Sequence, residues 1–369
     1  DLAAQNLYSV SIVLNQGDGT FEGAVSYAVA SRRTSNVHTL ISADLNGDGE
    51  LDLAAAGFDN VSVLFNQGDG TFGSAVSRVG DAYILLAADL NRDGKPDLAA
   101  AGPGDVDIVL SQGDATFKSA GNYGVQGWCL SSLVFADLND DSSLDSIGAF
   151  IEPFKTACGG PAGLSVSMNR GDGTFGDAMS YRVPGGSSTA IIADDFNGDG
   201  KLDLATVDSG CSYCDPMIPG RVSVLLNQGS GTFRDAVSYA GGGFSLVADD
   251  FDGDGMLELA SASFGCPDCD PPIPGDVSVL FNQRDGTFRD AVSYQVPEAG
   301  PRNPHVPEFL ISVLLIAADL NGDGHADFVP AVNDNVTILE LALLVQAELL
   351  VIQFVFFHQQ HVELFLAGH

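Results

Sequence analysis

The stretch Asp44-Leu45-Asn46-Gly47-Asp48-Gly49-Glu50-Leu51-Asp52 decides the fold, because near-copies of it recur five more times along the chain. Side chains with oxygen atoms stand at loop positions 1, 3 and 5, glycine stands at position 6, and a carboxylate closes the loop at position 9. Oxygen ligands at alternate positions suit calcium, a hard cation that takes about six to eight oxygens. The glycine permits the tight left-handed turn that such a loop needs. This acidic loop is therefore predicted to bind calcium.

The predicted ligands are the side chains at positions 1, 3, 5 and 9 and the backbone carbonyl at position 7. Five of the six loops have glycine at position 6, whereas the third has Ser142, so the site that begins at Asp137 is predicted to be the weakest. A single loop of this kind also fits a metal-free turn in which Asp and Asn side chains bind the backbone. Six copies in one register favour Ca2+, at up to six sites. The candidate residues are Asp44, Asn46, Asp48, Glu50, Asp52, Asp89, Asn91, Asp93, Lys95, Asp97, Asp137, Asn139, Asp141, Ser143, Asp145, Asp195, Asn197, Asp199, Lys201, Asp203, Asp250, Asp252, Asp254, Met256, Glu258, Asp319, Asn321, Asp323, His325 and Asp327.

The EF-hand, which is the usual context for such a loop, is excluded by the residues that follow. An EF-hand needs a bidentate Glu at position 12 and then a helix. Each acidic loop is instead followed by a short apolar run, such as residues 51–56, and then by a β-branched run, such as residues 61–65. The acidic loops are therefore predicted to join two β-strands. None of the six loops has Glu at position 12, where the residues are Ala55, Ala100, Gly148, Thr206, Ser261 and Pro330.

The acidic loop is one part of a longer repeat that predicts a four-stranded blade. In one full copy, strands are expected at residues 39–43, 51–57, 61–65 and 75–79, and a turn at residues 66–72 separates the last two. Gly-Asp-Gly between two apolar runs is a hairpin signal, so the Asp of this turn is interpreted as structural and not as a ligand. The Phe that ends the turn is expected to pack between neighbouring blades. We call the whole turn that ends at this Phe the Phe turn. Its copies are residues 15–21, 66–72, 111–117, 169–175, 227–233 and 282–288.

Blades that recur at this spacing predict an all-β fold. The first Asp of successive acidic loops recurs after 45 to 69 residues, which corresponds to one blade with variable insertions. Blades of this size arranged radially form a β-propeller. We predict seven antiparallel blades over residues 1–339, from seven expected third strands. These strands are expected at residues 10–14, 61–65, 106–110, 164–168, 222–226, 277–281 and 336–339.

These motifs resemble the FG-GAP/VCBS repeats of integrin alpha-subunit heads and of many secreted microbial proteins and lectins. The resemblance covers residue 1 to about residue 339 and depends on the fixed order of D-x-N-x-D-G-x-x-D, V-S-V-L-x-N and G-D-G-T-F. It implies a seven-bladed propeller with calcium in the loop between the first two strands of a blade. It also implies adhesion or carbohydrate binding as the common task, although the family does not share one ligand.

The composition narrows the class of partner. The chain has 49 acidic and 15 basic residues, for a net charge of -34, and nucleic acid is therefore excluded as a partner, because binding to phosphates relies on Lys and Arg. Bound cations would offset much of this charge. Weak calcium modules are tuned to the millimolar calcium outside cells, so a secreted, extracellular or cell-surface location is expected.

Insertions between the second and third strands are expected to display a glycan or protein ligand site, on the face opposite the acidic loops. They lie at residues 152–163, 209–220 and 264–275, in the fourth to sixth blades. Two of them carry a C-x-x-C motif, which could also indicate a four-cysteine zinc site. Because 51 residues separate the two motifs and the context is extracellular, disulfides within each motif are favoured, with Cys129 paired to Cys158.

The two ends of the chain depart from the repeat. Asp1 aligns with Asp52, so the first blade is expected to lack its opening strand, through cleavage of a precursor or because the chain is a fragment. Residues 340–369 form a divergent apolar tail, and its polar interruptions, such as Glu340 and Glu348, argue against a membrane span. Its β-prone residues around 351–357 are expected to close the first blade or to enter a neighbouring molecule by strand donation.

The sequence distinguishes three function classes: an enzyme, a binding module and a structural subunit. Catalysis is disfavoured, because the carboxylates are explained as calcium ligands and no nucleophile motif such as G-x-S-x-G or H-E-x-x-H occurs. An adhesion or carbohydrate-binding module with structural calcium is favoured. The alternative is a structural subunit of an extracellular filament or surface assembly that polymerises through its terminal strands.

Overall fold

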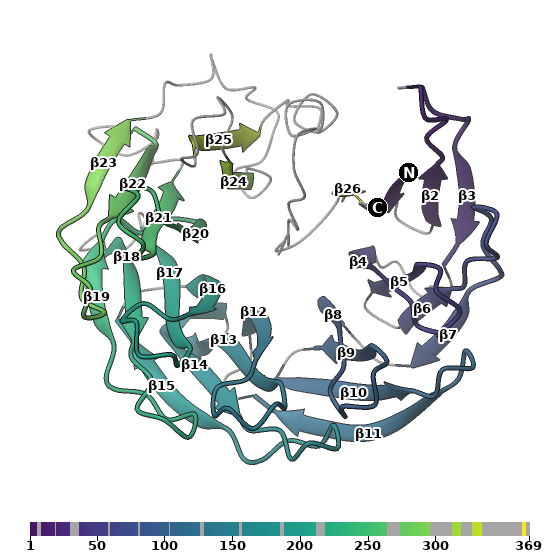
Figure 1. Ribbon diagram of the computed structural model, residues 1–369, viewed down its shortest axis with the longest axis horizontal. Coiled ribbons are helices and arrows are strands. Elements are labelled where there is room, and N and C mark those ends of the chain that lie inside the picture. The colour runs from purple at the N-terminus through teal and green to yellow at the C-terminus, as the bar shows by residue number, and fades with distance from the viewer. Residues whose placement is uncertain are drawn as a thin grey trace. The chain divides into compact units, whose positions relative to one another are not determined.

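The computed structural model describes most of the chain as antiparallel β-sheet (Figure 1). The chain divides into two compact units. One consists of Asp1–Val125, Met168–Asp177 and Ala347–His369, and the other of Gln126–Ser167 and Ala178–Gln346. The described residues are 1–5, 9–18, 20–29, 37–57, 60–79, 82–102, 104–125, 129–154, 157–184, 188–211, 218–263, 274–295, 312–318, 327–333 and 364–366.

Among its described residues, the first unit contains three four-stranded sheets in which neighbouring strands pair antiparallel. Each sheet corresponds to one predicted blade. The first sheet has the order β26 (Leu364–Leu366), β1 (Leu2–Gln5), β2 (Ser9–Val13) and β3 (Val25–Ala28). The second is β4 (Val37–Ala43), β5 (Asp52–Gly57), β6 (Asn60–Leu64) and β7 (Val76–Val79). The third is β8 (Ile84–Ala88), β9 (Asp97–Ala101), β10 (Asp105–Ser111) and β11 (Phe117–Gly124).

The part of the second unit that the structure describes contains three more four-stranded sheets and one strand pair. The first of these sheets is β12 (Cys129–Ala136), β13 (Asp145–Phe154), β14 (Ala157–Ser167) and β15 (Met179–Val183). The second is β16 (Ser188–Asp194), β17 (Asp203–Cys211), β18 (Ile218–Leu225) and β19 (Val237–Ala240). The third is β20 (Ser245–Asp249), β21 (Glu258–Ser263), β22 (Asp276–Leu280) and β23 (Val292–Gln295). The pair is β24 (Ser312–Ala318) and β25 (Asp327–Asn333).

The predicted all-β fold of four-stranded antiparallel blades is confirmed. No helix occurs among the residues that the structure describes, so none there is long and apolar enough to cross a membrane. The seven-blade count stays a prediction, because the third strand expected at 336–339 lies outside the described residues.

Small residues explain how the second strand of each blade is buried. β5 and β9 share the sequence Asp-Leu-Ala-Ala-Ala, and every residue in both strands is buried. Short side chains let both faces of such a strand approach the neighbouring layers closely. Most third strands alternate Val with Ser, and Ser hydroxyls on them pair across to the fourth strand, as in Ser223–Ser238 and Ser278–Ser293, both with 2.7 Å between Oγ atoms. Buried hydroxyls thereby receive a partner within the sheet.

Neighbouring sheets within each unit pack face to face through apolar cores. In the first unit, Val10 and Ile12 of β2 pack with Leu40 of β4 and Leu64 of β6. In the second unit, the sheets that contain β17 and β21 share a core that includes Val207, Val222, Leu246 and Leu259. Burial of this apolar surface is the main contribution to stability. Each blade therefore depends on its neighbour for a complete core.

The Phe turn packs against the preceding blade, as predicted. Phe288 lies 5.7 Å from Tyr239 between ring centroids, in an edge-to-face arrangement, and its backbone N–H donates to the Tyr239 hydroxyl at 3.1 Å. Tyr27 contacts Phe72 in the same way, at 5.7 Å and 3.2 Å. Edge-to-face pairs add to the energy of simple burial. The recurring Tyr of the fourth strand is therefore the partner of the next blade's Phe.

The insertions of two blades differ from expectation, because they lengthen strands instead of forming only loops. β13 and β14 contain 10 and 11 residues, compared with 6 and 5 in β5 and β6. Their pairing continues to Phe154 and Ala157. Likewise β17 and β18 stay paired to Cys211 and Ile218. Backbone hydrogen bonding across these segments favours the extended hairpin over a free loop.

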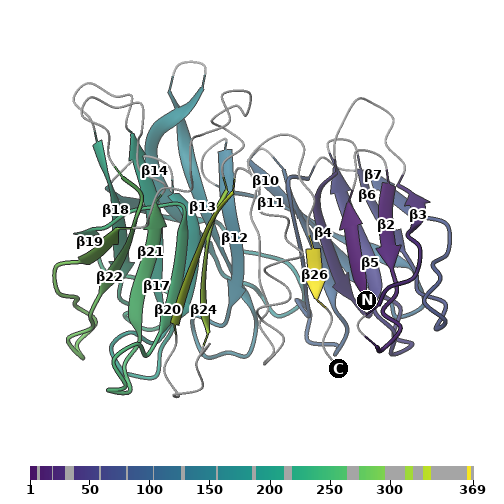
Figure 2. The same ribbon diagram turned by 90° about the horizontal axis from the view of Figure 1, so that it is seen from above.

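The opening position of the first sheet is filled by the end of the chain. β26 pairs antiparallel with β1, with Ala3 opposite Phe365, and lies beside the N-terminus in Figure 2. The paired segment is residues 364–366, later than the region around 351–357 from which a closing strand was expected. The expected strand at 351–357, the sixth acidic loop at 319–326 and the side chains of all six cysteines lie outside what the structure describes.

Candidate metal centre

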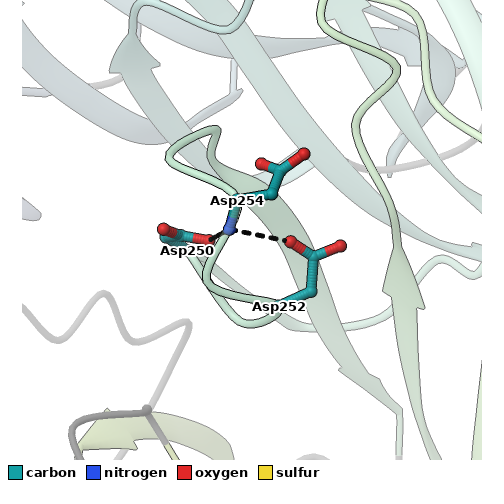
Figure 3. Close-up of side chains that lie close together, drawn as sticks. All are labelled: Asp250, Asp252 and Asp254. Carbon is teal, nitrogen blue, oxygen red and sulfur yellow. Dashed lines mark hydrogen bonds between the residues drawn. The ribbon is translucent and has the colours of Figure 1, made fainter.

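Five acidic loops are described in full, and each joins the first strand of a sheet to the second. In the 250–258 loop, the Asp250 carboxylate accepts backbone N–H groups from Gly253, Asp254 and Gly255, at 2.8 to 3.0 Å. Asp252 Oδ1 accepts from Asp254 N at 3.2 Å, and Figure 3 shows the three Asp side chains arranged around this turn. The backbone of the loop therefore turns around the position 1 carboxylate, which accepts several of its N–H groups.

The same hydrogen bonds recur in the other described loops. In the 44–52 loop, Asp44 Oδ2 accepts from Gly49 N at 2.9 Å and Asn46 Oδ1 accepts from Asp48 N at 2.8 Å. In the 195–203 loop, the equivalent distances to Gly200 N and Asp199 N are 2.7 and 2.9 Å. The loops at 89–97 and 137–145 repeat both bonds. Sequence spacing alone thus produces one backbone shape five times.

Left-handed backbone conformations are needed at position 6. Gly49 and Gly200 adopt φ values of 91° and 83° there, and Ser142 adopts 68°. A residue with a side chain is strained in this region, because its Cβ approaches the backbone. Ser142 nevertheless donates its N–H to Asp137 Oδ2 at 2.7 Å. The third loop therefore keeps the common shape but lacks the residue best suited to it, and its predicted weakness stays a prediction.

The position 9 carboxylate is buried and ties the acidic loop to the Phe turn. Asp52 is 0 % exposed; its Oδ2 accepts from Leu45 N at 2.9 Å and its Oδ1 from Asn66 N at 2.9 Å. Burial raises the pKa of Asp52, and likewise those of Asp97 and Asp203, to about 6. An ionised carboxylate in this place is disfavoured by desolvation until a cation compensates it.

Basic side chains contact the position 5 carboxylate in three loops. Lys201 Nζ lies 2.9 Å from Asp199 Oδ2, Arg284 Nη2 lies 2.9 Å from Asp254 Oδ2, and the equivalent Lys95 pair spans 3.5 Å. The hydrogen bond from Lys201 lowers the pKa of Asp199. These pairs are exposed, so each contributes little to stability. A metal ion bound at position 5 would therefore lie close to these positive charges.

The oxygen atoms of one loop fit a shared cation. Carboxylate oxygens of Asp250, Asp252 and Asp254 all lie within 4.8 Å of one another. Two ligands that each lie about 2.5 Å from a calcium ion are at most about 5 Å apart, so this spacing is compatible with one ion. In the other four described loops, positions 1, 3 and 5 are Asp, Asn and Asp. The donors are hard oxygens throughout, as calcium prefers.

One group of residues was missed by sequence reasoning, namely the first residue of the Phe turn. Asn227 donates through Nδ2 to Leu202 O of its own blade and to Leu138 O of the preceding acidic loop, both at 2.9 Å. Asn282 does the same with Leu257 O and Phe196 O, at 3.0 and 2.8 Å. The recurrence of Asn at this turn was visible in the sequence. Its partner in another blade was not.

Asp1 occupies the place that alignment with Asp52 predicts. Its Oδ1 accepts from Asn15 N at 2.7 Å, which repeats the bond between Asp52 and Asn66 in the next blade. The carboxylate at position 9 therefore anchors the Phe turn in the first blade also.

Comparison with known families matches the FG-GAP-like repeat at residues 1–55, 44–100, 89–147, 156–206 and 250–329, which is more than half of the chain. The chain belongs to the FG-GAP-like repeat family. Three of the matched segments begin at the first Asp of an acidic loop, at residues 44, 89 and 250. A search of curated proteins finds no match. The narrower likeness to integrin alpha-subunit heads stays a prediction.

Solved structures resemble this FG-GAP-like chain over most of its length. An Agrocybe aegerita lectin that recognises non-reducing terminal N-acetylglucosamine is 20% identical, with a TM-score of 0.52, and the match covers 89% of this chain and 84% of the lectin. The V. cholerae biofilm matrix protein Bap1 is 12% identical, with a TM-score of 0.43, over 89% of this chain and 73% of Bap1. The first likeness supports the propeller-like fold class and extends to the fold alone.

Proposed function

We propose that this FG-GAP-like chain is an extracellular calcium-binding module that recognises a glycan or protein ligand, with calcium in a structural role. The observation that carries the proposal is the acidic loop itself, which recurs with the same hydrogen bonds in five described copies. A repeated, identical geometry indicates a repeated structural task. A single substrate site would require only one copy.

The chain's own residues define how calcium would be held. Side chains at positions 1, 3, 5 and 9 and the position 7 carbonyl would supply oxygen ligands, as in Asp250, Asp252, Asp254, Met256 and Glu258. Calcium supplies positive charge that offsets the buried position 9 carboxylate. The ion would thereby fix the hairpin between the first two strands of each blade. Millimolar extracellular calcium suits such exposed loops, which supports a secreted or cell-surface location.

A binding role is favoured over catalysis. The loop carboxylates already accept backbone N–H groups, as Asp250 does from three residues, so their orientation serves the turn. The net charge of -34 argues against nucleic acid as the ligand. The lectin of the same fold class makes a glycan the first ligand to test, although 20% identity transfers no binding residue.

A glycan array probed with the full chain tests the proposed binding role. Terminal N-acetylglucosamine should be included because the Agrocybe aegerita lectin recognises it. We expect binding to a defined set of glycans in millimolar calcium and its loss after calcium removal. A double variant of one loop, Asp195→Asn with Asp199→Asn, should bind more weakly at limiting calcium and recover at high calcium. Absence of binding to any glycan or extracellular protein in calcium would overturn the binding role.

A second candidate is a building block that polymerises by strand donation. The observation in its favour is the pairing of β26 with β1, which extends over only three residue pairs. The same register formed between two chains would produce a repeating contact. Light scattering of the purified chain in calcium distinguishes the two, since a binding module remains one size at all concentrations. A ladder of oligomers that disappears when residues 364–366 are deleted would favour polymerisation.

A further inference from the structure

A continuous series of hydrogen bonds links successive acidic loops in the second unit. Leu138, at position 2 of one loop, donates its N–H to the position 9 carboxylate of Asp145 at 3.1 Å and accepts from Asn227 Nδ2 at 2.9 Å through its carbonyl. Asn227 N in turn donates to Asp203 Oδ1, the position 9 carboxylate of the next loop, at 2.7 Å. The backbone of Leu138 and one Asn thus join two position 9 carboxylates.

The series continues by the same steps into a third loop. Phe196 N donates to Asp203 Oδ2 at 3.2 Å, and Phe196 O accepts from Asn282 Nδ2 at 2.8 Å. Asn282 N then donates to Glu258 Oε1 at 3.4 Å, and Phe251 N donates to Glu258 Oε2 at 2.9 Å. The 137–145, 195–203 and 250–258 loops are therefore joined through groups that are buried or half-buried.

The chemistry of the Asn side chain explains why it suits this place. Its amide nitrogen carries two N–H donors, and Asn227 directs one to Leu202 O of its own blade and one to Leu138 O of the preceding loop. Its Oδ1 accepts from Gly229 N at 2.8 Å, which fixes the amide orientation. A hydroxyl has one donor and reaches one carbonyl only.

The first unit contains the single-donor version of the same link. Ser111 Oγ donates to Leu45 O at 2.8 Å, and Ser111 N donates to Asp97 Oδ1 at 2.8 Å. Leu45 N donates to Asp52, so the 44–52 and 89–97 loops are also joined. The link between neighbouring loops therefore persists when Ser replaces Asn.

We propose that Asn227 and Asn282 couple cation binding among the 137–145, 195–203 and 250–258 loops, so that a cation bound in one loop raises the affinity of the next. This inference rests on the calcium function proposed above. An ion at one loop would fix its position 9 carboxylate and hence the backbone of the residue at position 2. The neighbouring Asn then holds the next position 9 carboxylate already ordered, so the second ion meets a smaller ordering cost. Coupling of this kind changes affinity by about fivefold or more.

A calcium titration of the full chain tests the coupling, with calcium alone as the probe. The variants are Asn227→Ala, Asn282→Ala and the conservative Asn227→Ser. Asn66→Ala is the matched control: Asn66 Nδ2 donates to Leu51 O of its own blade at 3.2 Å, and among the described residues it makes no bond to a neighbouring loop. Circular dichroism in saturating calcium confirms that each variant is folded.

We expect the wild-type isotherm to have a Hill coefficient above 1, which is lower in Asn227→Ala and in Asn282→Ala because each variant removes one link, with the number of bound ions unchanged. Asn66→Ala should keep the wild-type steepness, and Asn227→Ser should retain most of it, as Ser111 implies. If Asn227→Ala does not fold, a lower Hill coefficient in Asn282→Ala together with a wild-type-like Hill coefficient in Asn227→Ser supports the coupling. Calcium binding by independent sites in the wild type overturns the coupling alone, whereas absence of any calcium binding overturns the proposed function.

Discussion

Ser142 is the one position 6 residue among the described loops that is not glycine, and its φ of 68° lies in the left-handed region that favours glycine. Ser142→Gly should stabilise the chain by about 1 kcal/mol, because glycine adopts this conformation without a Cβ penalty. Urea denaturation checks the prediction. The reverse control is Gly200→Ser, whose added Cβ meets no atom within 4 Å, so that its cost reports strain alone. Equal stability of Ser142→Gly and the wild type would contradict the strain argument.

The position 9 carboxyls predict an unusual response to pH in the metal-free protein. Burial raises the pKa of Asp52, Asp97 and Asp203 from 3.8 to about 6, so the folded chain binds protons more tightly than the unfolded chain between these values. The contribution of these carboxyls to the free energy of unfolding is therefore fully present below pH 3.8 and is lost as the pH rises through about 6. The loss is at most about 3 kcal/mol for each carboxyl.

Melting temperatures of the metal-free chain at pH 5 and pH 7 check this sign, and the higher value is expected at pH 5. The Phe-turn carboxyls, such as Asp69, do not oppose the trend, because hydrogen bonds from Thr71 lower the pKa of Asp69 below 3.8. With calcium bound, we expect the opposite slope, since protons then compete with the ion. A metal-free chain that melts lower at pH 5 than at pH 7 would contradict the first expectation.

Residue spacing predicted the turn of each acidic loop but not every hydrogen bond that the loop side chains make. The turn formed by Asp44 and Asn46 follows from local spacing, because all of its partners lie within five residues. The second use of Asp52, as acceptor for Asn66, spans 14 residues, and the Asn227 link to Leu138 spans 89. Local patterns contain no information about such distant partners, so the links between loops appear only in the structure.

At the scale of the element, the Phe turn should contribute to stability in proportion to its burial. Phe288 is 3% exposed and lies 6.0 Å from Phe196 and 5.7 Å from Tyr239 between ring centroids. Phe288→Ala should therefore cost about 3 kcal/mol or more of unfolding free energy. Phe21 occupies the same turn position but is 42% exposed, so Phe21→Ala should cost under about 1 kcal/mol. Chemical denaturation measures both, and similar losses would contradict the packing role.

Strand positions were predictable from sequence to within two residues for the second blade, because apolar and polar residues alternate there between clear turn signals. Strands expected at 39–43 and 75–79 are observed at Val37–Ala43 and Val76–Val79. The insertion at 152–163 was less predictable, since Gly and Pro within it indicate a loop, yet backbone pairing with β13 extends the strand to Ala157. Cross-strand hydrogen bonds override local propensity in such a hairpin.

At the scale of the whole molecule, the proposed calcium sites would explain both the acidic composition and the repeat. A net charge of -34 disfavours a compact chain through self-repulsion, and repeated cation sites would relieve it. The FG-GAP-like repeats and the propeller-like fold class were both predictable, because the motifs recur in fixed order. The ligand was not, since a repeat of structural residues identifies the scaffold and leaves its partner open.

Calcium bound per chain, measured by equilibrium dialysis at millimolar free calcium together with the melting temperature, tests the central claim most directly. The account predicts several ions per chain, up to the six that the loops allow, and a melting temperature that falls when they are removed. Each site at a free calcium of about 100 times its Kd should add about 2.7 kcal/mol. A chain that retains no calcium under these conditions and melts at the same temperature with and without it would contradict the account.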